Sequence, residues 1–143
     1  MSICPPLATA MDMKTSPLAL LKDPSLLKTD ALINGQWVSG SSRFDVLDPS
    51  NGTKLVDVAN LGPVETEQAI ASANDAWSAW RNKTGKERHA ILLKWFNLLM
   101  ANQEDLALIM TSEQGKPLAE SRGEIAYAAA YVEWFAEEAR RVY

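Results

Sequence analysis

The chain has 143 residues, of which 47% are hydrophobic and 22% are charged, and its formal net charge is -4 at pH 7. This balance fits one folded domain, because a disordered chain would be poorer in Leu, Ile, Trp and Phe. Only seven Gly, seven Pro and one Cys exclude a collagen-like or disulfide-rich chain. The acidic charge argues against nucleic-acid binding, and no apolar run approaches the roughly 20 residues of a membrane span.

The counts of His and Cys limit the chemistry further. The only His is His89 and the only Cys is Cys4. A histidine-based catalytic triad or a zinc site of His and Cys ligands needs several such residues at fixed spacing. Neither is expected here.

The first 28 residues lack the features of a targeting signal. They contain no Arg, and Asp12 precedes the first basic side chain, Lys14. A secretory signal needs a basic start and an apolar core, and a mitochondrial transit peptide is rich in Arg and poor in acids. We therefore expect residues 1–28 to be a flexible tail and the protein to be cytoplasmic. Cys4 lies in this tail with nothing nearby to activate its thiol.

Turn residues divide the next segment into short strands. Asn34-Gly35 is the strongest signal for a two-residue hairpin turn, and it predicts that Ala31–Ile33 pairs with Gln36–Val38. A second run of turn residues, DPSNG, separates a strand at Phe44–Leu47 from one at Lys54–Val58. We expect these strands to form one small antiparallel sheet.

From Pro63 the apolar residues recur every three or four positions, which is typical of helices. Four helices are expected: Val64–Trp80, Lys86–Ala101, Gln103–Glu113, and a last one from Pro117 to the chain end. The second is apolar on most of its circumference, so we expect burial on several sides. No Gly, Asn or Pro stops the last helix before Tyr143, so the chain is expected to end in mid-element.

Local signals mark the helix ends. Thr84 and Glu87 form a capping box at the start of the second helix. Asn102, followed by Asp105, is interpreted as the N-cap of the third helix. Gly115 ends that helix, because Gly accepts the left-handed cap conformation.

Few side chains are arranged for catalysis. Ser121 beside Glu120 and Glu124 is the only obvious nucleophile with a neighbouring base, and we interpret the group as a solvated helix face. His89 is interpreted as a surface or interhelix histidine. The chain has no Gly-rich loop for a phosphate group.

Carboxylates recur at a spacing of four residues on the last helix. Glu133 and Glu137 repeat the spacing of the earlier pair. We interpret both pairs as solvated faces, with metal binding as the alternative, and expect Glu137 to attract Arg141.

Trp134 and Phe135 are adjacent bulky aromatic residues. On a helix they point about 100° apart, so both cannot lie at the centre of one apolar face. One of them must line a seam or the edge of a pocket.

Several segments, read together, match one known family in order and spacing. They are Ala31–Val38 (ALINGQWV), Val46–Gly52 (VLDPSNG), Glu67–Arg81, Lys86–Arg88, Lys94–Met100 (KWFNLLM), Glu113–Pro117 (EQGKP), Gly123–Tyr127 and Val132–Tyr143 (VEWFAEEARRVY). With these segments, about residues 18–143 resemble the N-terminal part of the aldehyde dehydrogenase superfamily. The EQGKP and EWFAEEARRVY runs are most similar to its NAD(P)-dependent succinate-semialdehyde dehydrogenase branch.

The resemblance implies an α/β, aldehyde dehydrogenase-like fold that is truncated here. Residues 29–143 would be its N-terminal part, a small antiparallel β region followed by about four helices, without the Rossmann core and the catalytic domain. In that family a thiolate attacks the aldehyde, hydride passes to nicotinamide, and the thioester is hydrolysed. The family's catalytic Cys and Glu and its cofactor-binding motifs match no residue of this chain. We therefore expect no catalytic or cofactor-binding residue here, no bound NAD or NADP, and no activity from this chain alone.

Residue roles and partners also follow from the resemblance. The last helix resembles the one that borders the substrate entrance, which makes Trp134 and Phe135 entrance residues. Leu47 and Glu113 match loosely the positions that bind a structural cation in some members, and no metal site is expected. The full-length form would be a homo-oligomer that oxidises a small aldehyde in γ-aminobutyrate catabolism, with no nucleic-acid or membrane partner.

The apolar faces of the second and last helices would need a partner that the Rossmann sheet supplies in the full-length family. We expect the chain alone to expose large apolar patches and to self-associate. The alternative hypothesis is a standalone helical module that binds or modulates a dehydrogenase subunit.

Overall fold

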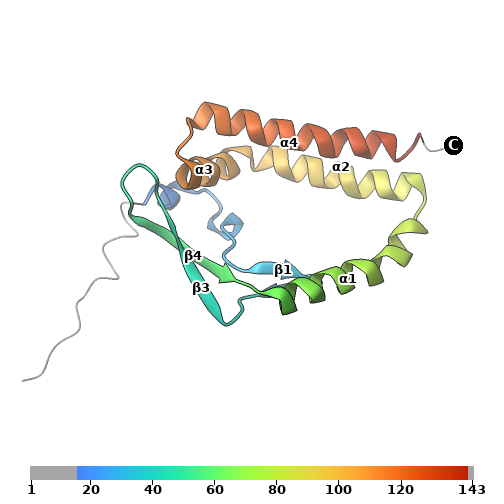
Figure 1. Cartoon of the computed structure of the whole chain (residues 1–143). Coiled ribbons are helices and arrows are strands. Elements are labelled where there is room, and N and C mark those ends of the chain that lie inside the picture. The colour runs from blue at the N-terminus through green and yellow to red at the C-terminus, as the bar shows by residue number, and fades with distance from the viewer. Residues whose placement is uncertain (1–15, 142–143) are drawn as a thin grey trace, which may run out of the picture.

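A computed structural model describes residues 16–141, which form two two-stranded antiparallel sheets and four α-helices (Figure 1). The elements are β1 (Ala31–Ile33), β2 (Gln36–Val38), β3 (Ser42–Leu47), β4 (Lys54–Asn60), α1 (Pro63–Arg81), α2 (Gly85–Ala101), α3 (Gln103–Gln114) and α4 (Leu118–Glu138). The predicted order, a small antiparallel β region followed by four helices, is confirmed. Cys4 and the first 15 residues of the predicted tail lie outside the described residues, as does Tyr143.

The first hairpin forms where its turn residues predict. Asn34 has φ 50° and Gly35 has φ 73°, so both central residues of the turn are left-handed. Two such residues give a turn whose twist matches that of the flanking strands. Ala31 pairs with Val38 and Ile33 with Gln36, which confirms the predicted pairing.

The strands form two separate hairpins, so the prediction of one sheet is wrong. β3 pairs only with β4, with Phe44 opposite Val58 and Val46 opposite Val56. The hairpins are joined instead by the segment before β1. The Ala59 amide donates to the Thr29 carbonyl at 2.8 Å, and Arg43 of β3 bonds to the same carbonyl. These bonds connect the two hairpins without pairing a strand of one with a strand of the other. The hairpins therefore remain two separate sheets.

The capping box at the start of α2 is confirmed. The Thr84 hydroxyl accepts the Glu87 amide at 3.3 Å, and the Glu87 carboxylate accepts the Thr84 amide at 2.7 Å. Asn102 is the N-cap residue of α3, as predicted, but its side chain serves α2 instead. Its amide group donates to the Leu98 carbonyl at 2.8 Å, so it satisfies the end of α2 and makes no cap bond to α3. The Gly115 cap is confirmed, with φ 75°.

Helix α4 ends at Glu138, so the prediction that it continues to the chain end is wrong. Arg140 donates its amide to the Glu137 carbonyl at 3.1 Å, and Arg141 donates to Glu138 at 2.9 Å. These are bonds between residues three apart, which tighten the last turn and stop α-helical propagation without a Gly or Pro.

Helices α2 and α4 lie side by side, and α3 packs against the N-terminal half of α4, whereas α1 and the strands form the opposite side of the molecule (Figure 1). The fully buried residues of α4 are small, namely Ser121, Ala129 and Ala136. Small side chains let helix backbones approach closely. None of the helices in the described part of the chain is long and apolar enough to cross a membrane.

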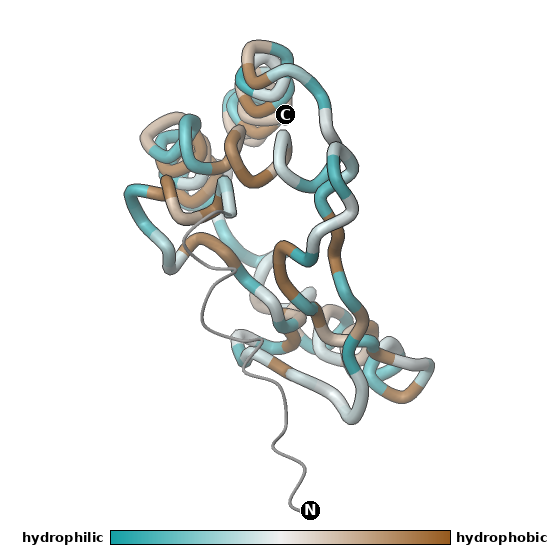
Figure 2. The backbone as a smooth tube through the Cα atoms, turned by 90° about the vertical axis from the view of Figure 1, so that its left-hand side faces the viewer, coloured by the Kyte–Doolittle hydropathy of each residue, from teal (hydrophilic) through white to brown (hydrophobic). Residues whose placement is uncertain are grey.

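Many large apolar side chains are exposed on the surface of the described residues. The apolar residues, brown in Figure 2, recur along the helices and strands, yet no residue of α2 is buried. Trp95 and Leu98 of α2 are 55% and 52% exposed. The prediction that α2 is buried on several sides is therefore not met within residues 16–141. Large apolar side chains are exposed, as expected.

Residues 16–27, within the segment predicted to be a tail, pack against α3. They form two short 3-10 turns, Pro17–Leu20 and Pro24–Leu26, and Leu18 and Leu21 are buried. The buried Asp105 carboxylate accepts the backbone amides of Lys22 at 3.1 Å and Asp23 at 2.8 Å. Asp105 thus fastens this segment to the helices.

Replacing Gly85 with Ala is expected to destabilise the chain by about 1–3 kcal/mol, because the new Cβ would overlap the carbonyl group of Ala139 at the end of α4. Gly123→Ala is the matched control: nothing lies within 4 Å of its Cβ position, so it should stabilise α4 by about 0.5–1 kcal/mol. Urea unfolding followed by circular dichroism measures both. Equal stabilisation by the two variants would show that α2 and α4 are not in close contact at Gly85.

Asp105→Ala is expected to release the segment before β1, because two backbone amides lose a charged acceptor and each such bond contributes about 1.5–3 kcal/mol. Limited trypsin digestion measures the change as faster cleavage after Lys22. Asp105→Asn retains one acceptor oxygen and should show an intermediate rate. Identical rates for all three proteins would contradict the anchoring role.

Candidate functional site

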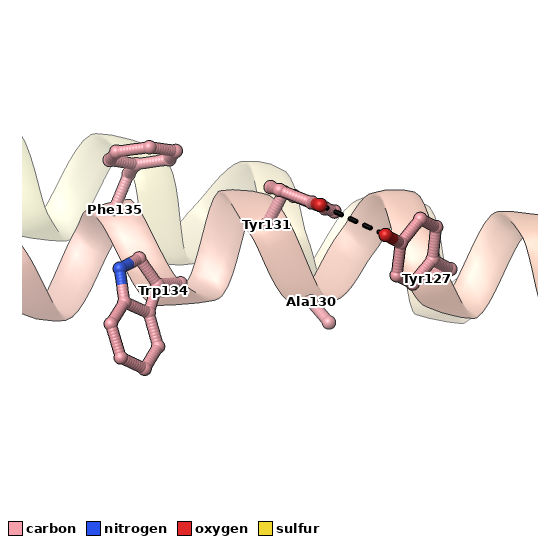
Figure 3. A pocket seen from close by; sticks show the side chains of 5 residues that line it. All are labelled: Tyr127, Ala130, Tyr131, Trp134 and Phe135. Carbon is pink, nitrogen blue, oxygen red and sulfur yellow. Dashed lines mark hydrogen bonds between the residues drawn. The ribbon is translucent and has the colours of Figure 1, made fainter.

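The described part of α4 carries an open aromatic pocket of about 300 Å³. It is lined by Tyr127, Ala130, Tyr131, Trp134 and Phe135 (Figure 3). These residues recur at steps of three and four, so α-helical geometry gathers them on one side of α4. Because they lie opposite the small buried residues, packing fixes the side of the helix on which the pocket opens.

Trp134 and Phe135 both line this pocket. Their side chains diverge from the helix in Figure 3, as adjacent helical residues must, and they are 62% and 59% exposed. One was expected at the edge of a pocket, and the structure brings both to the same one.

Tyr127 and Tyr131 form the polar end of the pocket. Their hydroxyl oxygens are 2.9 Å apart, and the rings meet edge to face with centroids 5.0 Å apart (Figure 3). The hydrogen bond to Tyr131 raises the pKa of Tyr127, and desolvation and the charge of Glu124 raise this pKa further. Tyr127 therefore stays neutral at physiological pH and can exchange hydrogen bonds with a polar ligand atom.

The carboxylates beside the pocket lie in solvent. Glu120, Glu124, Glu133 and Glu137 are all exposed, which confirms the predicted solvated faces. Glu124 forms an ion pair with Lys116 at 2.8 Å. Within residues 16–141 no three His, Cys, Asp or Glu side chains are placed to hold a metal ion. Leu47 in β3 and Glu113 in α3 are both exposed.

Ser121 is not on a solvated face, so that interpretation is wrong. Its side chain is fully buried, and its hydroxyl shares a hydrogen bond of 2.8 Å with the Thr111 hydroxyl of α3. This bond ties α4 to α3 and leaves the oxygen inaccessible to a substrate. The spacing of Ser121, Ala129 and Ala136, eight and seven residues apart, is a sequence signal that marks this buried side.

His89 is an interhelix histidine, as one of its two interpretations predicts. Its side chain is 15% exposed, its Nδ1 lies 2.9 Å from the carbonyl oxygen of Ala136, and the Glu137 carboxylate is 3.6 Å away. The prediction that Arg141 pairs with Glu137 is wrong. Arg141 bonds to Glu138 at 2.9 Å, because the tightened last turn brings residues three apart together.

The chain matches the model of the "Aldehyde dehydrogenase family" over residues 37–143. It is 54% identical over 125 residues to a succinate-semialdehyde dehydrogenase [NADP(+)] of Escherichia coli, and 50% identical over 125 residues to a 3-sulfolactaldehyde dehydrogenase of Pseudomonas putida. Each alignment covers 86% of this chain and 26% of the relative, so the chain spans about a quarter of the length of the curated relatives it matches.

Among solved structures, the chain is similar to a succinate-semialdehyde dehydrogenase from Burkholderia pseudomallei. The TM-score is 0.83 and the sequence identity is 55%, over 87% of this chain and 26% of that chain. The helices and hairpins described above therefore occur, in this arrangement, within a much longer polypeptide.

Proposed function

Because this chain belongs to the aldehyde dehydrogenase family, we propose that it is the N-terminal segment of an NAD(P)-dependent enzyme that oxidises succinate semialdehyde to succinate. The observation that carries the proposal is the 54% identity to the E. coli enzyme over 86% of this chain. The solved structure from B. pseudomallei, at 55% identity, bears the same enzyme name and supports the same substrate.

The names of the relatives define the substrate class. Succinate semialdehyde and 3-sulfolactaldehyde are both short aldehydes with an anionic group, a carboxylate in one and a sulfonate in the other. The proposal therefore specifies a short aldehyde with a distal anion, and places succinate semialdehyde first because the corresponding identity is higher. The proposed cofactor is NAD or NADP, which accepts hydride when bound to the full-length enzyme.

This chain alone is proposed to be inactive and to bind no cofactor. Oxidation of an aldehyde through a thioester needs a thiolate, and the sequence contains a single Cys, Cys4, which lies outside the described residues. The pocket on α4 is lined by four aromatic side chains and one Ala, and it has no charged group to hold a dinucleotide phosphate.

Within this proposal, Trp134 and Phe135 border the substrate entrance. Both are exposed and both line the open pocket on α4. Rigid aromatic rings at an entrance remove water from an approaching aldehyde. The hydroxyl groups of Tyr127 and Tyr131 give the same pocket a polar end.

The exposed apolar residues support an assembled form. Ile91, Trp95 and Leu98 of α2 are each about half exposed, at 46%, 55% and 52%. Apolar surface of this extent marks an interaction site. The isolated chain is proposed to self-associate through this surface, which the Rossmann sheet is proposed to cover in the full-length protein. That the full-length protein is a homo-oligomer is proposed from the resemblance to the family alone.

The native polypeptide that carries this sequence, purified from its source, is expected to reduce NAD or NADP with succinate semialdehyde. The isolated 143-residue chain should give no reduction, because it supplies no catalytic thiolate. NAD(P)H absorbance measures both, and butanal, which has the same carbon chain without the carboxylate, is the matched control substrate.

Two outcomes would contradict the proposal. Faster turnover of butanal than of succinate semialdehyde would contradict the proposal that the substrate carries a distal anion. An inactive native polypeptide of 15.7 kDa that copurifies with a dehydrogenase subunit would establish the interaction module instead.

Trp134→Ala and Phe135→Ala in the active enzyme are expected to raise KM for succinate semialdehyde about tenfold, equivalent to roughly 1.4 kcal/mol of binding, with a smaller change in kcat. Trp37→Ala is the control, because Trp37 is also exposed but lies on β2, away from the pocket. Steady-state kinetics measures the split. An unchanged KM in both α4 variants, or an equal rise in the control, would exclude the entrance role.

A further inference from the structure

At the C-terminal end of α4, the Ala136 carbonyl group loses the backbone donor that a continuing helix would give it. The Ala139 amide donates to Phe135 at 3.0 Å, as in a regular helix, but the Arg140 amide donates to Glu137 at 3.1 Å. In a continuing α-helix it would donate to Ala136. Ala136 is fully buried, so water cannot replace the lost donor, and an unsatisfied carbonyl there would be costly.

His89 of α2 supplies the missing donor. Its Nδ1 lies 2.9 Å from the Ala136 oxygen, and a carbonyl oxygen only accepts, so Nδ1 must carry the proton. The neighbouring Arg88 is directed elsewhere, because its guanidinium bonds to the Lys83 carbonyl. The Glu137 carboxylate, 3.6 Å from Nδ1, is the charged group paired with His89.

A second contact holds the same end of the helix. Gly85, in the first turn of α2, lies so close to the Ala139 carbonyl group that a Cβ would overlap it. The first two turns of α2 thus contact α4 at residues 136 and 139. The aromatic pair Trp134 and Phe135 lies in the turn just before these contacts, and the Phe135 carbonyl accepts the last regular helical bond.

We propose that His89 is a positioning residue for the aromatic rim formed by Trp134 and Phe135. Its Nδ1–H caps the Ala136 carbonyl, fixes where α4 stops, and thereby sets the direction in which the two rings leave the helix. This inference rests on the proposed entrance role only for its effect on substrate. The cap itself is a property of α2 and α4.

The first test is the tautomer of the imidazole. His89 is the only His of the 143-residue sequence. In a long-range proton–nitrogen NMR spectrum of the native polypeptide, its imidazole is identified by the signal that disappears in His89→Gln. The expected neutral form carries its proton on Nδ1. A proton on Nε2, or an average of the two forms, would overturn the proposal.

The second test separates the hydrogen bond from packing. In His89→Asn the amide nitrogen takes the place of Nδ1, whereas in His89→Gln it lies one methylene farther out although the volume is closer to that of His. In the Asn variant, the amides of residues 139–141 should exchange at the rate of the unsubstituted protein. In the Gln variant they should exchange roughly fivefold faster, which is the change expected when one hydrogen bond is lost. A packing role predicts the opposite order, and equal rates in the two variants would likewise reject the cap.

The effect of His89 on the orientation of Trp134 is measured by fluorine NMR after incorporation of 5-fluorotryptophan. The fluorine signal of Trp134, identified by its absence in Trp134→Phe, should shift in His89→Gln and keep its position in His89→Asn. Trp37 on β2 is the internal control and should not move in either variant. An unmoved Trp134 signal in the Gln variant would refute the positioning role. None of these readouts needs substrate, so loss of the proposed dehydrogenase function would leave the cap and its effect on Trp134 independently established.

Discussion

The close packing of α4 against α2 and α3 is the constraint on which the other features of the chain depend. It is possible because the fully buried residues of α4 are Ser121, Ala129 and Ala136, whose side chains are among the smallest. Short side chains let the backbones approach, and polar groups then reach across the interface. The Thr111–Ser121 hydroxyl bond and the His89 bond to the Ala136 carbonyl are both of this kind.

This packing makes α4 a helix with two different sides. One side is dry and made of small residues, and the other carries the aromatic side chains that line the pocket (Figure 3). A large side chain on the buried side would push α4 outward and move the pocket with it, because packed helices are stiff. The orientation of Trp134 and Phe135 is therefore determined by residues that do not line the pocket.

The described residues form only a thin interior, and this agrees with the short length of the chain relative to its relatives. Five hydrophobic residues are buried, and three of them are Ala. Larger apolar groups such as Trp95 of α2 and Ile70 of α1 are exposed. The chain spans about a quarter of the length of the relatives it matches and is similar to a solved structure at a TM-score of 0.83. The exposed apolar groups support the proposal that further residues of a full-length protein cover them.

The features that residue patterns predicted correctly are local: the Asn34-Gly35 hairpin, the Thr84–Glu87 capping box, the Gly115 cap and the order of the helices. Each is set by residues within about four positions, a range over which turn and cap chemistry acts. Adjacency on a helix also predicted that Trp134 or Phe135 borders a pocket. The contacts between distant residues could not be predicted in this way and follow from the packing of the helices. Asp105 binds residues 82 and 83 positions away, His89 binds one 47 positions away, and Ser121 is buried by its contact with α3. Such polar side chains can face water or cap a distant backbone group equally well, and packing alone selects between the two.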